Sequence, residues 1–348
     1  MFFWIIFILT LILLTGNYKI GLKNYSRPFF FLSFIFITII TIIRFDIGYD
    51  YKSYWLMVSD LNISQEDFYY LEPFTRVVIG FSRLFDYPPL FFIIYGVLTV
   101  SMVYYCIWNY SKLPLVGVLI YCAFFYLMTL GFIRQGLALS IVLLSYPHII
   151  NGKIFKFLVM IILAGIVHYP ALIALIIYPL YNYCSVKKLG FLLLLGFVGF
   201  QGGIILLQRI YPQFVYLHYL DSLQSLTGGN LVRQIFLILT LVMLFLSIKK
   251  HLATETKLIL ISFIGVFFYF ALGGHIGGRI GWYFLIYLCI SVPNIISYYP
   301  KVVRQVLNTS LCFIFISTIY VSTLSKDKEQ FTPYRTILQI DVNHPRFK

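Results

Sequence analysis

The sequence predicts an all-α polytopic integral membrane protein: one membrane domain over residues 1–348, built as a bundle of about 10–12 transmembrane helices with an amphipathic helix on its outer side. Three observations support this fold class. Hydrophobic residues make up 61% of the chain and charged residues only 11%, whereas a soluble domain carries about 25% charged residues. Apolar runs recur as far as residue 323, so a removable signal peptide cannot account for them. The net charge is divided unequally between the two sets of loops that these runs create, because nearly all the acidic residues lie on one side.

The apolar runs give the expected helices in order. About 20 residues are needed to cross the hydrocarbon core of a membrane, and runs of spanning character fall near 2–15, 29–43, 91–108, 115–130, 135–150, 190–207, 231–248, 257–272, 279–298 and 305–323. The run over 154–183 is too long for one helix, and His168-Tyr169-Pro170 divides it into two pieces of roughly 14 residues. Each piece is shorter than the roughly 30 Å core. This pattern predicts a helical hairpin with His168 at its tip.

The charges of the loops predict the orientation. One set of loops holds 13 basic residues and a single acid, Glu255, whereas the opposite side has a net charge of only +2. Cytoplasmic loops carry an excess of lysine and arginine, which places the first set in the cytoplasm. Residues 44–90, the loop over 209–230 and the C-terminal tail over 324–348 are therefore expected on the outer side. The net charge of +14 then reflects membrane topology rather than nucleic-acid binding.

The two sides also differ in the type of basic residue. Lysine supplies eleven of the 13 cytoplasmic bases, whereas arginine supplies nine of the 13 outer ones. A planar guanidinium suits bidentate binding of phosphate or carboxylate, so we expect an anionic ligand on the outer side. The alternative is that these arginines only anchor helix ends at the interface. The outer arginines are Arg44, Arg76, Arg83, Arg134, Arg209, Arg233, Arg279, Arg335 and Arg346.

The long outer loop over 44–90 contains a predicted amphipathic helix over 74–85. Pro73 precedes it and Pro88-Pro89 follows it, as at helix boundaries. We expect this helix to lie on the membrane surface, where it either packs over the bundle or roofs a cleft. Its apolar residues recur at spacings of three and four: Phe74, Val77, Val78, Phe81, Leu84 and Phe85.

Four residues are candidates to orient or deprotonate a hydroxyl group: His168, Asp46, Asp50 and Glu72. Asp46 and Asp50 are four residues apart and would share one face if their segment were helical. The structural alternative is that His168 is an ordinary interior histidine and that the aspartates pair with outer arginines. The tyrosine and tryptophans Tyr54, Trp55 and Trp282 are candidates to stack on sugar rings or to form an interfacial belt.

Two arginine segments are candidates for anion binding. Arg134-Gln135 opens a helix whose following small residues permit close packing. The glycine-rich segment 272–284 holds His275 and Arg279, with Tyr283 one helical turn beyond Arg279. Their structural alternatives are an interfacial anchor and a flexible turn. The sequence has no cluster of acids and histidines with metal-ligand spacing and no paired CxxC motif, so we expect no metal and no cofactor.

Taken in order, these features resemble the EpsG-like, Wzy-type polymerases of bacterial surface polysaccharides. The resemblance implies a fold similar to that of the integral-membrane (GT-C-like) glycosyltransferases. It also implies an enzyme that joins oligosaccharide repeat units, carried on undecaprenyl pyrophosphate, at the outer face of the bacterial cytoplasmic membrane. Membrane lipid, a flippase and chain-length regulator proteins are the further expected partners. The residues that carry the resemblance are Arg44, Asp46, Gly48, Asp50, Tyr54, Glu72-Pro73, Arg134-Gln135, Ala164, His168, Arg279, Tyr283 and Pro333-Tyr334.

The resemblance also suggests roles for these residues. Arg134 and Arg279 would hold the pyrophosphate, with Arg44 and Arg335 assisting and Gln135, His275, Tyr283 and Tyr334 beside them, while one of the four candidates above would act on the acceptor hydroxyl. Two other functions stay open: a flippase for lipid-linked oligosaccharides, and a ligase or single-sugar transferase that uses a lipid-linked donor. A flippase often shows internal repeats, and this sequence has no obvious one.

Overall fold

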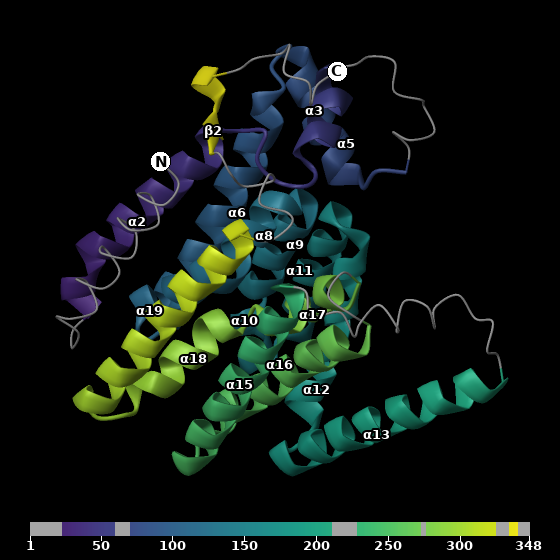
Figure 1. Cartoon of the computed structure of the whole chain (residues 1–348), viewed down its shortest axis with the longest axis vertical. Helices are drawn as coiled ribbons and strands as arrows, with labels where there is room; N and C mark the ends of the chain where they lie inside the picture. Colours follow the sequence, from purple (N-terminus) through teal and green to yellow (C-terminus); the bar gives the residue numbers. More distant parts are fainter. Residues whose placement is uncertain (1–22, 60–69, 211–227, 273–275, 325–333, 340–348) are drawn as a thin grey trace.

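The computed structural model describes residues 23–59, 70–210, 228–272, 276–324 and 334–339, and in these ranges the chain is almost entirely helical (Figure 1). Several sequence-based expectations lie outside the described residues. They are the apolar run 2–15, His275, most of the loop over 209–230 and all but six residues of the tail beyond 324.

Within the described ranges, five stretches of helix are long and apolar enough to cross a membrane, which confirms the all-α polytopic class. Three of them are single helices: α6 (Pro89–Tyr110), α15 (Gly228–Lys249) and α16 (Ala253–Ala271). The stretch Pro114–Gly131 is formed by α7 (Pro114–Tyr121), the π-helical turn η1 (Cys122–Tyr126) and α8 (Leu127–Gly131). The stretch Ile133–Ile150 is formed by α9 (Ile133–Leu144) and α10 (Tyr146–Ile150). A sixth consists of α17 (Gly278–Leu285) and α18 (Leu288–Ser297), which meet at a bend of 42°.

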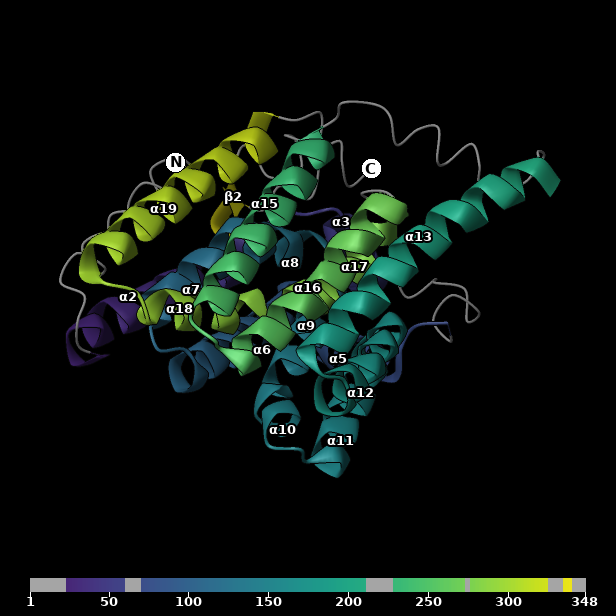
Figure 2. The ribbon, with the colours of Figure 1, turned by 90° about the horizontal axis from the view of Figure 1, so that it is seen from below.

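Three more helices occupy predicted apolar runs: α2 (Lys23–Ile43), α13 (Val186–Ile210) and α19 (Lys301–Leu324). Helix α13 packs on α16 and extends away from the other helices (Figures 1 and 2). The count of 10–12 spans stays a prediction.

Helices α16 and α17 pack through two glycines. A Cβ atom at Gly265 would lie 2.5 Å from the carbonyl oxygen of Gly281, and a Cβ at Gly281 would lie 2.5 Å from that of Gly265. Only residues without a side chain allow two helix backbones to come this close. The contact fixes the position of α17, which carries Arg279 and Tyr283.

The chain turns sharply at His168. Helix α11 (Ile154–Val167) ends there because His168 is extended (φ −156°, ψ 107°), and the 3₁₀ helix η2 (Tyr169–Ile176) and α12 (Ile177–Tyr183) follow. The backbone N–H of His168 donates to Ala164, and the carbonyl of His168 accepts from Ala171. The imidazole therefore projects from the junction of two helices, which fixes its direction.

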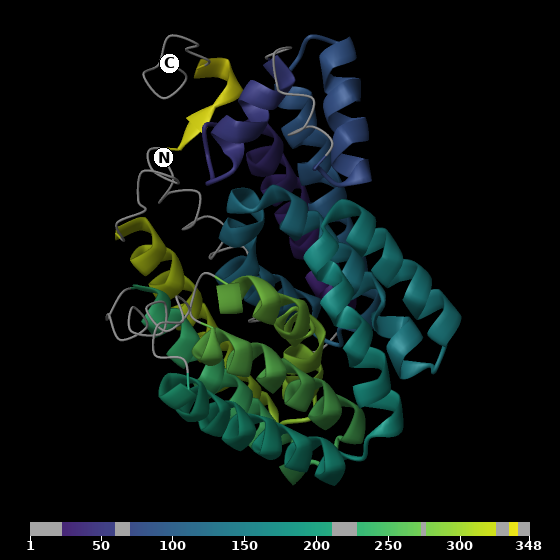
Figure 3. The ribbon, with the colours of Figure 1, turned by 90° about the vertical axis from the view of Figure 1, so that its right-hand side faces the viewer.

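Helices α3 (Tyr51–Ser59) and α5 (Pro73–Leu84) lie together at one end of the molecule (Figures 1 and 3). Helix α5 packs on α3 and α6, where Arg83 donates to the carbonyl of Met57 (3.1 and 2.6 Å) and Thr75 shares a hydrogen bond with Tyr95 (2.9 Å). Its buried residues are Thr75, Val78, Ile79 and Ser82.

The predicted apolar face of α5 therefore does not pack over the bundle. Phe81 and Leu84 are 45% and 82% exposed, and Val77 and Phe85 are exposed as well. Only Val78 of the predicted face is buried. The interior side of this helix instead combines two hydroxyl-bearing residues, Thr75 and Ser82, with the apolar Val78 and Ile79.

A two-stranded antiparallel sheet joins distant parts of the chain. Strand β1 (Arg44–Phe45) pairs with β2 (Arg335–Thr336), with Arg44 opposite Thr336 and Phe45 opposite Arg335. The hydroxyl of Tyr334 donates to the carbonyl of Ile40, and the 3₁₀ helix η6 (Ile337–Gln339) follows β2. The described part of the C-terminal tail is thus bound to the end of α2.

We predict that Gly265→Ala destabilises the protein. The added methyl group must push α16 and α17 apart, and overpacking of this kind costs about 1–3 kcal/mol. Gly190→Ala is the matched control because a Cβ at Gly190 meets no atom within 4 Å. Thermal unfolding of the detergent-solubilised proteins compares them. A melting temperature for Gly265→Ala equal to that of the control would show that the close approach is not needed.

Candidate functional site

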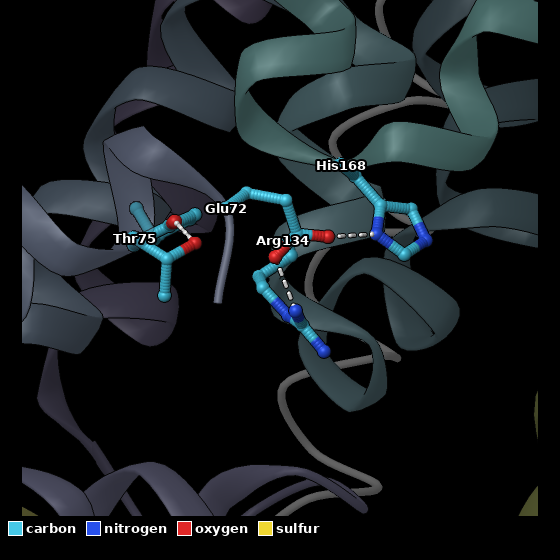
Figure 4. A network of polar contacts seen from close by, with 5 residues as sticks. Glu72, Thr75, Arg134 and His168 are labelled. Atoms are coloured by element: carbon cyan, nitrogen blue, oxygen red, sulfur yellow. Dashed lines mark hydrogen bonds and ion pairs between the residues drawn. The ribbon is translucent and has the colours of Figure 1, made fainter. Parts of the chain in front are cut away.

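A single carboxylate, that of Glu72, binds both His168 and Arg134 (Figure 4). His168 Nδ1 donates to Glu72 Oε1 at 3.0 Å, and Arg134 Nη1 donates to Glu72 Oε2. Glu72 is buried, whereas Arg134 and His168 are partly exposed. The three side chains come from the residue before α5, the first turn of α9 and the turn after α11.

Electrostatics keep Glu72 ionised. Burial alone raises the pKa of this carboxyl, but the hydrogen bond from His168 and the charge of Arg134 outweigh burial and bring the pKa down to about 2. An ionised carboxylate with such a low pKa is an acceptor and a weak base. Glu72 therefore holds His168 and Arg134 in place rather than removing a proton.

The start of α5 positions Glu72. Glu72 is extended (φ −60°, ψ 148°) and precedes Pro73, whose fixed φ suits the first position of a helix. The carbonyl of Glu72 accepts the first intrahelical bond, from the N–H of Arg76 at 3.1 Å. The bond between Thr75 and Tyr95 then ties this first turn to α6 (Figure 4 labels Thr75).

Asp50 faces the same group of cations but is held differently. Its carboxylate accepts a hydrogen bond from the backbone N–H of Ile133 and lies within electrostatic range of Arg134, Arg279 and His168. Burial is the largest influence and raises the pKa of Asp50, despite the opposing effect of those cations and of the amide. Among the residues that the structure describes, Asp50 forms no ion pair. Asp50 is therefore the more basic of the two carboxylates.

The loop before Asp50 is fitted against the end of α8. Gly48 has a φ of +106°, and a Cβ there would lie 2.3 Å from the carbonyl oxygen of Leu130, so no other residue fits without a shift. The backbone N–H of Asp50 donates to the carbonyl of Gly131 at 3.1 Å. These contacts bring Asp50 to the N-terminus of α9.

Arg279 lies beside this group with its guanidinium unpaired. Gln135 Nε2 donates to the backbone carbonyl of Arg279 at 2.6 Å, so Gln135 positions Arg279. The guanidinium lies 4.3 Å from the ring centroid of Phe132. Among the described residues, its side chain has no hydrogen-bond or ion-pair partner, and Nε of Arg134 also lacks one. Two guanidinium groups thus retain donors for an anion.

Tyr283 is the innermost residue of the group. It is fully buried on α17, and its hydroxyl lies within electrostatic range of Glu72 and Arg134. In the part of the chain that the structure describes, this hydroxyl has no hydrogen-bond partner. Since an unpaired buried hydroxyl is costly, Tyr283 is poised to donate to a group that enters between the two arginines.

Arg44 and Asp46 lie apart from this group. Arg44 is 1% exposed, donates from Nη1 to the carbonyl of Leu130 at 3.1 Å and lies 5.8 Å from the ring centroid of Phe92. Asp46 pairs with Arg335 (Oδ2 to Nη1, 2.5 Å) and is buried. Each of these charges serves the packing around the sheet.

Asp46 and Asp50 do not share a helix face, because their segment is not helical. Residues 44–45 form a strand, Asp46 has a φ of +52° and α3 begins only at Tyr51. Tyr334 likewise lies at the sheet, and His275 lies outside the described residues.

The aromatic residues are also placed differently from the expectation. Tyr54, Trp55 and Trp282 are buried against other aromatic rings and are not open to a sugar. Tyr49 is exposed and stacks on Phe132 at 5.2 Å. Sequence reasoning missed both Tyr49 and Phe132. Their proximity to Asp50 and to Arg134 in the chain was the only available signal.

Comparison with known proteins identifies a family. A model of the EpsG family matches residues 27–336, a range that contains the Glu72, Asp50, Arg134, His168 and Arg279 group. No curated protein and no solved structure matches the chain, so the likeness to GT-C-like glycosyltransferases stays a prediction. No group of three or more potential metal ligands occurs among the described residues.

We predict a specific pH dependence for the stabilisation by Glu72. Since folding lowers its pKa, the ionised carboxylate stabilises the protein fully above its ordinary value of 4.5, and this contribution is lost as the pH falls toward about 2. Glu72→Gln should therefore lower the melting temperature by a constant amount between about pH 8 and 5.5 and by less below pH 4.5.

Asp86→Asn is the control, because Asp86 is an exposed acid at the other end of α5. Melting curves of the detergent-solubilised variants over this pH series make the comparison. If Glu72→Gln melts at the same temperature as the unmodified protein at pH 7, the carboxylate does not hold the three segments together.

Proposed function

This chain belongs to the EpsG family, and membership of that family suggests a general role in polysaccharide polymerisation. We propose that it is an integral-membrane glycosyltransferase that joins lipid-linked oligosaccharide repeat units. The proposed donor is an undecaprenyl-pyrophosphate-linked oligosaccharide, and the proposed acceptor is the hydroxyl of a second repeat unit. The distribution of lysine and arginine supports an active site on the outer face of the bacterial cytoplasmic membrane.

The observation that carries this proposal is the convergence of two incompletely paired guanidinium groups, Arg134 and Arg279, on one basic carboxylate, Asp50. The arginines suit a pyrophosphate, because their planar donors match its oxygens. The carboxylate suits an attacking hydroxyl, because a base acts best when its pKa is close to the working pH.

The proposed reaction forms one bond and breaks one bond at the anomeric carbon of the donor. The acceptor oxygen attacks the anomeric carbon of the donor, and the bond from that carbon to the pyrophosphate oxygen breaks with its electron pair on the leaving group. Arg134 and Arg279 stabilise the negative charge that develops there; the loss of one such donor typically costs about 10²–10³ in rate. Asp50 takes the hydroxyl proton.

His168 is proposed to orient the acceptor. Its Nδ1 donates to Glu72, which in the neutral imidazole leaves the lone pair on Nε2 free to accept a hydrogen bond. Glu72 thus selects the tautomer of His168 as well as the direction of Arg134. Gln135 acts through its bond to the backbone of Arg279 and is a positioning residue.

We predict that Asp50→Asn and Arg279→Ala slow polymer formation by about 10²-fold or more while leaving the fold intact. The assay uses purified protein in lipid with a defined undecaprenyl-pyrophosphate repeat unit and resolves the product as a ladder. Loss of a general base typically costs about 10²–10⁴ in rate, so little ladder should form at equal protein. Arg76→Ala in α5 and Asp86→Asn in the turn after it are the matched controls, and both should retain the ladder.

A normal ladder from Asp50→Asn would refute its role as the base. Failure of the unmodified protein to form any ladder would refute the polymerase itself. Transfer of intact lipid-linked unit between leaflets without a ladder would favour the flippase, and a single addition would favour a ligase or single-sugar transferase.

We predict that Arg279→Gln moves the acid limb of the pH–rate profile upward. Asp50 must be ionised to accept a proton, and Arg279 favours the ionised form by lowering the pKa of Asp50. Without that charge the pKa rises further, so residual activity is lost at a higher pH than in the unmodified protein. Initial rates between pH 4 and 8, roughly the range in which such a group titrates, provide the test. An unshifted acid limb would mean that Arg279 does not act on the titrating base.

A further inference from the structure

Two neighbouring helices present exposed apolar side chains on either side of the Glu72–His168 contact. Glu72 immediately precedes α5, and His168 immediately follows α11, so this one hydrogen bond joins the two ends. The two helices pack against each other. The exposed apolar residues include Val77, Phe81 and Leu84 on α5, Phe85 directly after it, and Ile162, Leu163 and Ile166 in the half of α11 that is nearer to His168.

The exposed side of α5 differs from an ordinary lipid-facing surface in where it ends. Helix α15 also exposes large apolar residues, among them Phe245 at 65%, but that helix carries none of the residues of the candidate site. Helix α5 begins directly at the carboxylate that binds Arg134. An apolar surface that leads to a cationic group is suited to a molecule with an anionic head and a long apolar chain.

We propose that the exposed apolar residues of α5 and α11 bind the polyisoprenyl chain of the donor while Arg134 and Arg279 bind its pyrophosphate. This inference rests on the proposed function, since it places the lipid part of the same substrate. Continuity with the cationic group supports this occupant over bulk phospholipid. The polyisoprenyl chain lies along α5 and α11 and leaves the opposite side of Arg134 and Arg279 open for the acceptor.

This arrangement accounts for the large exposed apolar residues on the outer side of α5, whose interior side carries the hydroxyl-bearing Thr75 and Ser82 beside apolar residues. Thr75 and Ser82 satisfy their hydroxyl groups by bonds to Tyr95 and to the carbonyl of Val78. The apolar side is then free for a ligand. Contact with the polyisoprenyl chain would hold α5 in position. It would thereby also hold Glu72, the residue that immediately precedes α5.

Photo-crosslinking tests the site without requiring turnover. A benzophenone amino acid replaces Phe81 or Ile162 in the full-length protein in lipid vesicles, and Phe245 serves as the control because it is also an exposed apolar residue. The probe is radiolabelled undecaprenyl pyrophosphate without sugar. We expect several-fold stronger labelling at positions 81 and 162 than at 245, competition by unlabelled probe, and loss of labelling when Arg134→Ala is added.

The proposal would be overturned in favour of bulk lipid if labelling were equal at the three positions and unlabelled probe did not reduce it. A second measurement uses activity: Phe81→Ser should raise the KM for an undecaprenyl donor but not for a farnesyl donor, whereas Phe245→Ser should change neither. Equal KM effects with both donors would also overturn it. Specific labelling without a polymer ladder would keep the lipid site and reject the polymerase, and a ladder without specific labelling would do the reverse.

Discussion

The geometry of the site depends on one buried carboxylate. Glu72 binds a histidine with one oxygen and an arginine with the other, and so joins three segments that are distant in the sequence. Breaking a buried ion pair by removing one partner is far more costly than its net contribution suggests, because the remaining charge stays buried without compensation. Each of the three side chains is therefore held by the others.

The charges of the chain fall into two groups. Asp46 and Arg335 pair with each other, and Arg44 donates from Nη1 to a helix-end carbonyl; its Nε also lacks a partner among the described residues, but its side chain is buried. Arg134 and Arg279 keep donors that no described residue uses, and Asp50 keeps its basicity. A charge that is fully paired has little free energy left for a ligand, whereas an unpaired one in a low-dielectric surrounding interacts strongly. The second group is therefore where a ligand has most to gain.

The features that the sequence predicts well are local. Apolar length identifies the spans, and the His168-Tyr169-Pro170 break and the helix after Pro73 follow from backbone constraints of neighbouring residues. That Asp46 pairs with an outer arginine was one of the two sequence-based alternatives, but that this arginine is Arg335 was not predictable, because the two residues meet only through the tertiary fold. The face that α5 buries was also not predictable from its apolar spacing. In water the apolar face of a helix turns inward, but beside a membrane the exterior is apolar as well, so large apolar residues can lie on the exposed face.

The pairing of β1 with β2 links the end of the first described helix to the last described residues of the chain. Membrane proteins are synthesised from the N-terminus, and their helices enter the bilayer as they emerge. Strand β1 and the buried side chain of Asp46 must therefore wait for nearly the whole chain before Arg335 arrives. Until then the loop that leads to Asp50 is held by its contacts with the end of α8 but not by β2 and Arg335. The site therefore takes its final form only after β2 has been synthesised.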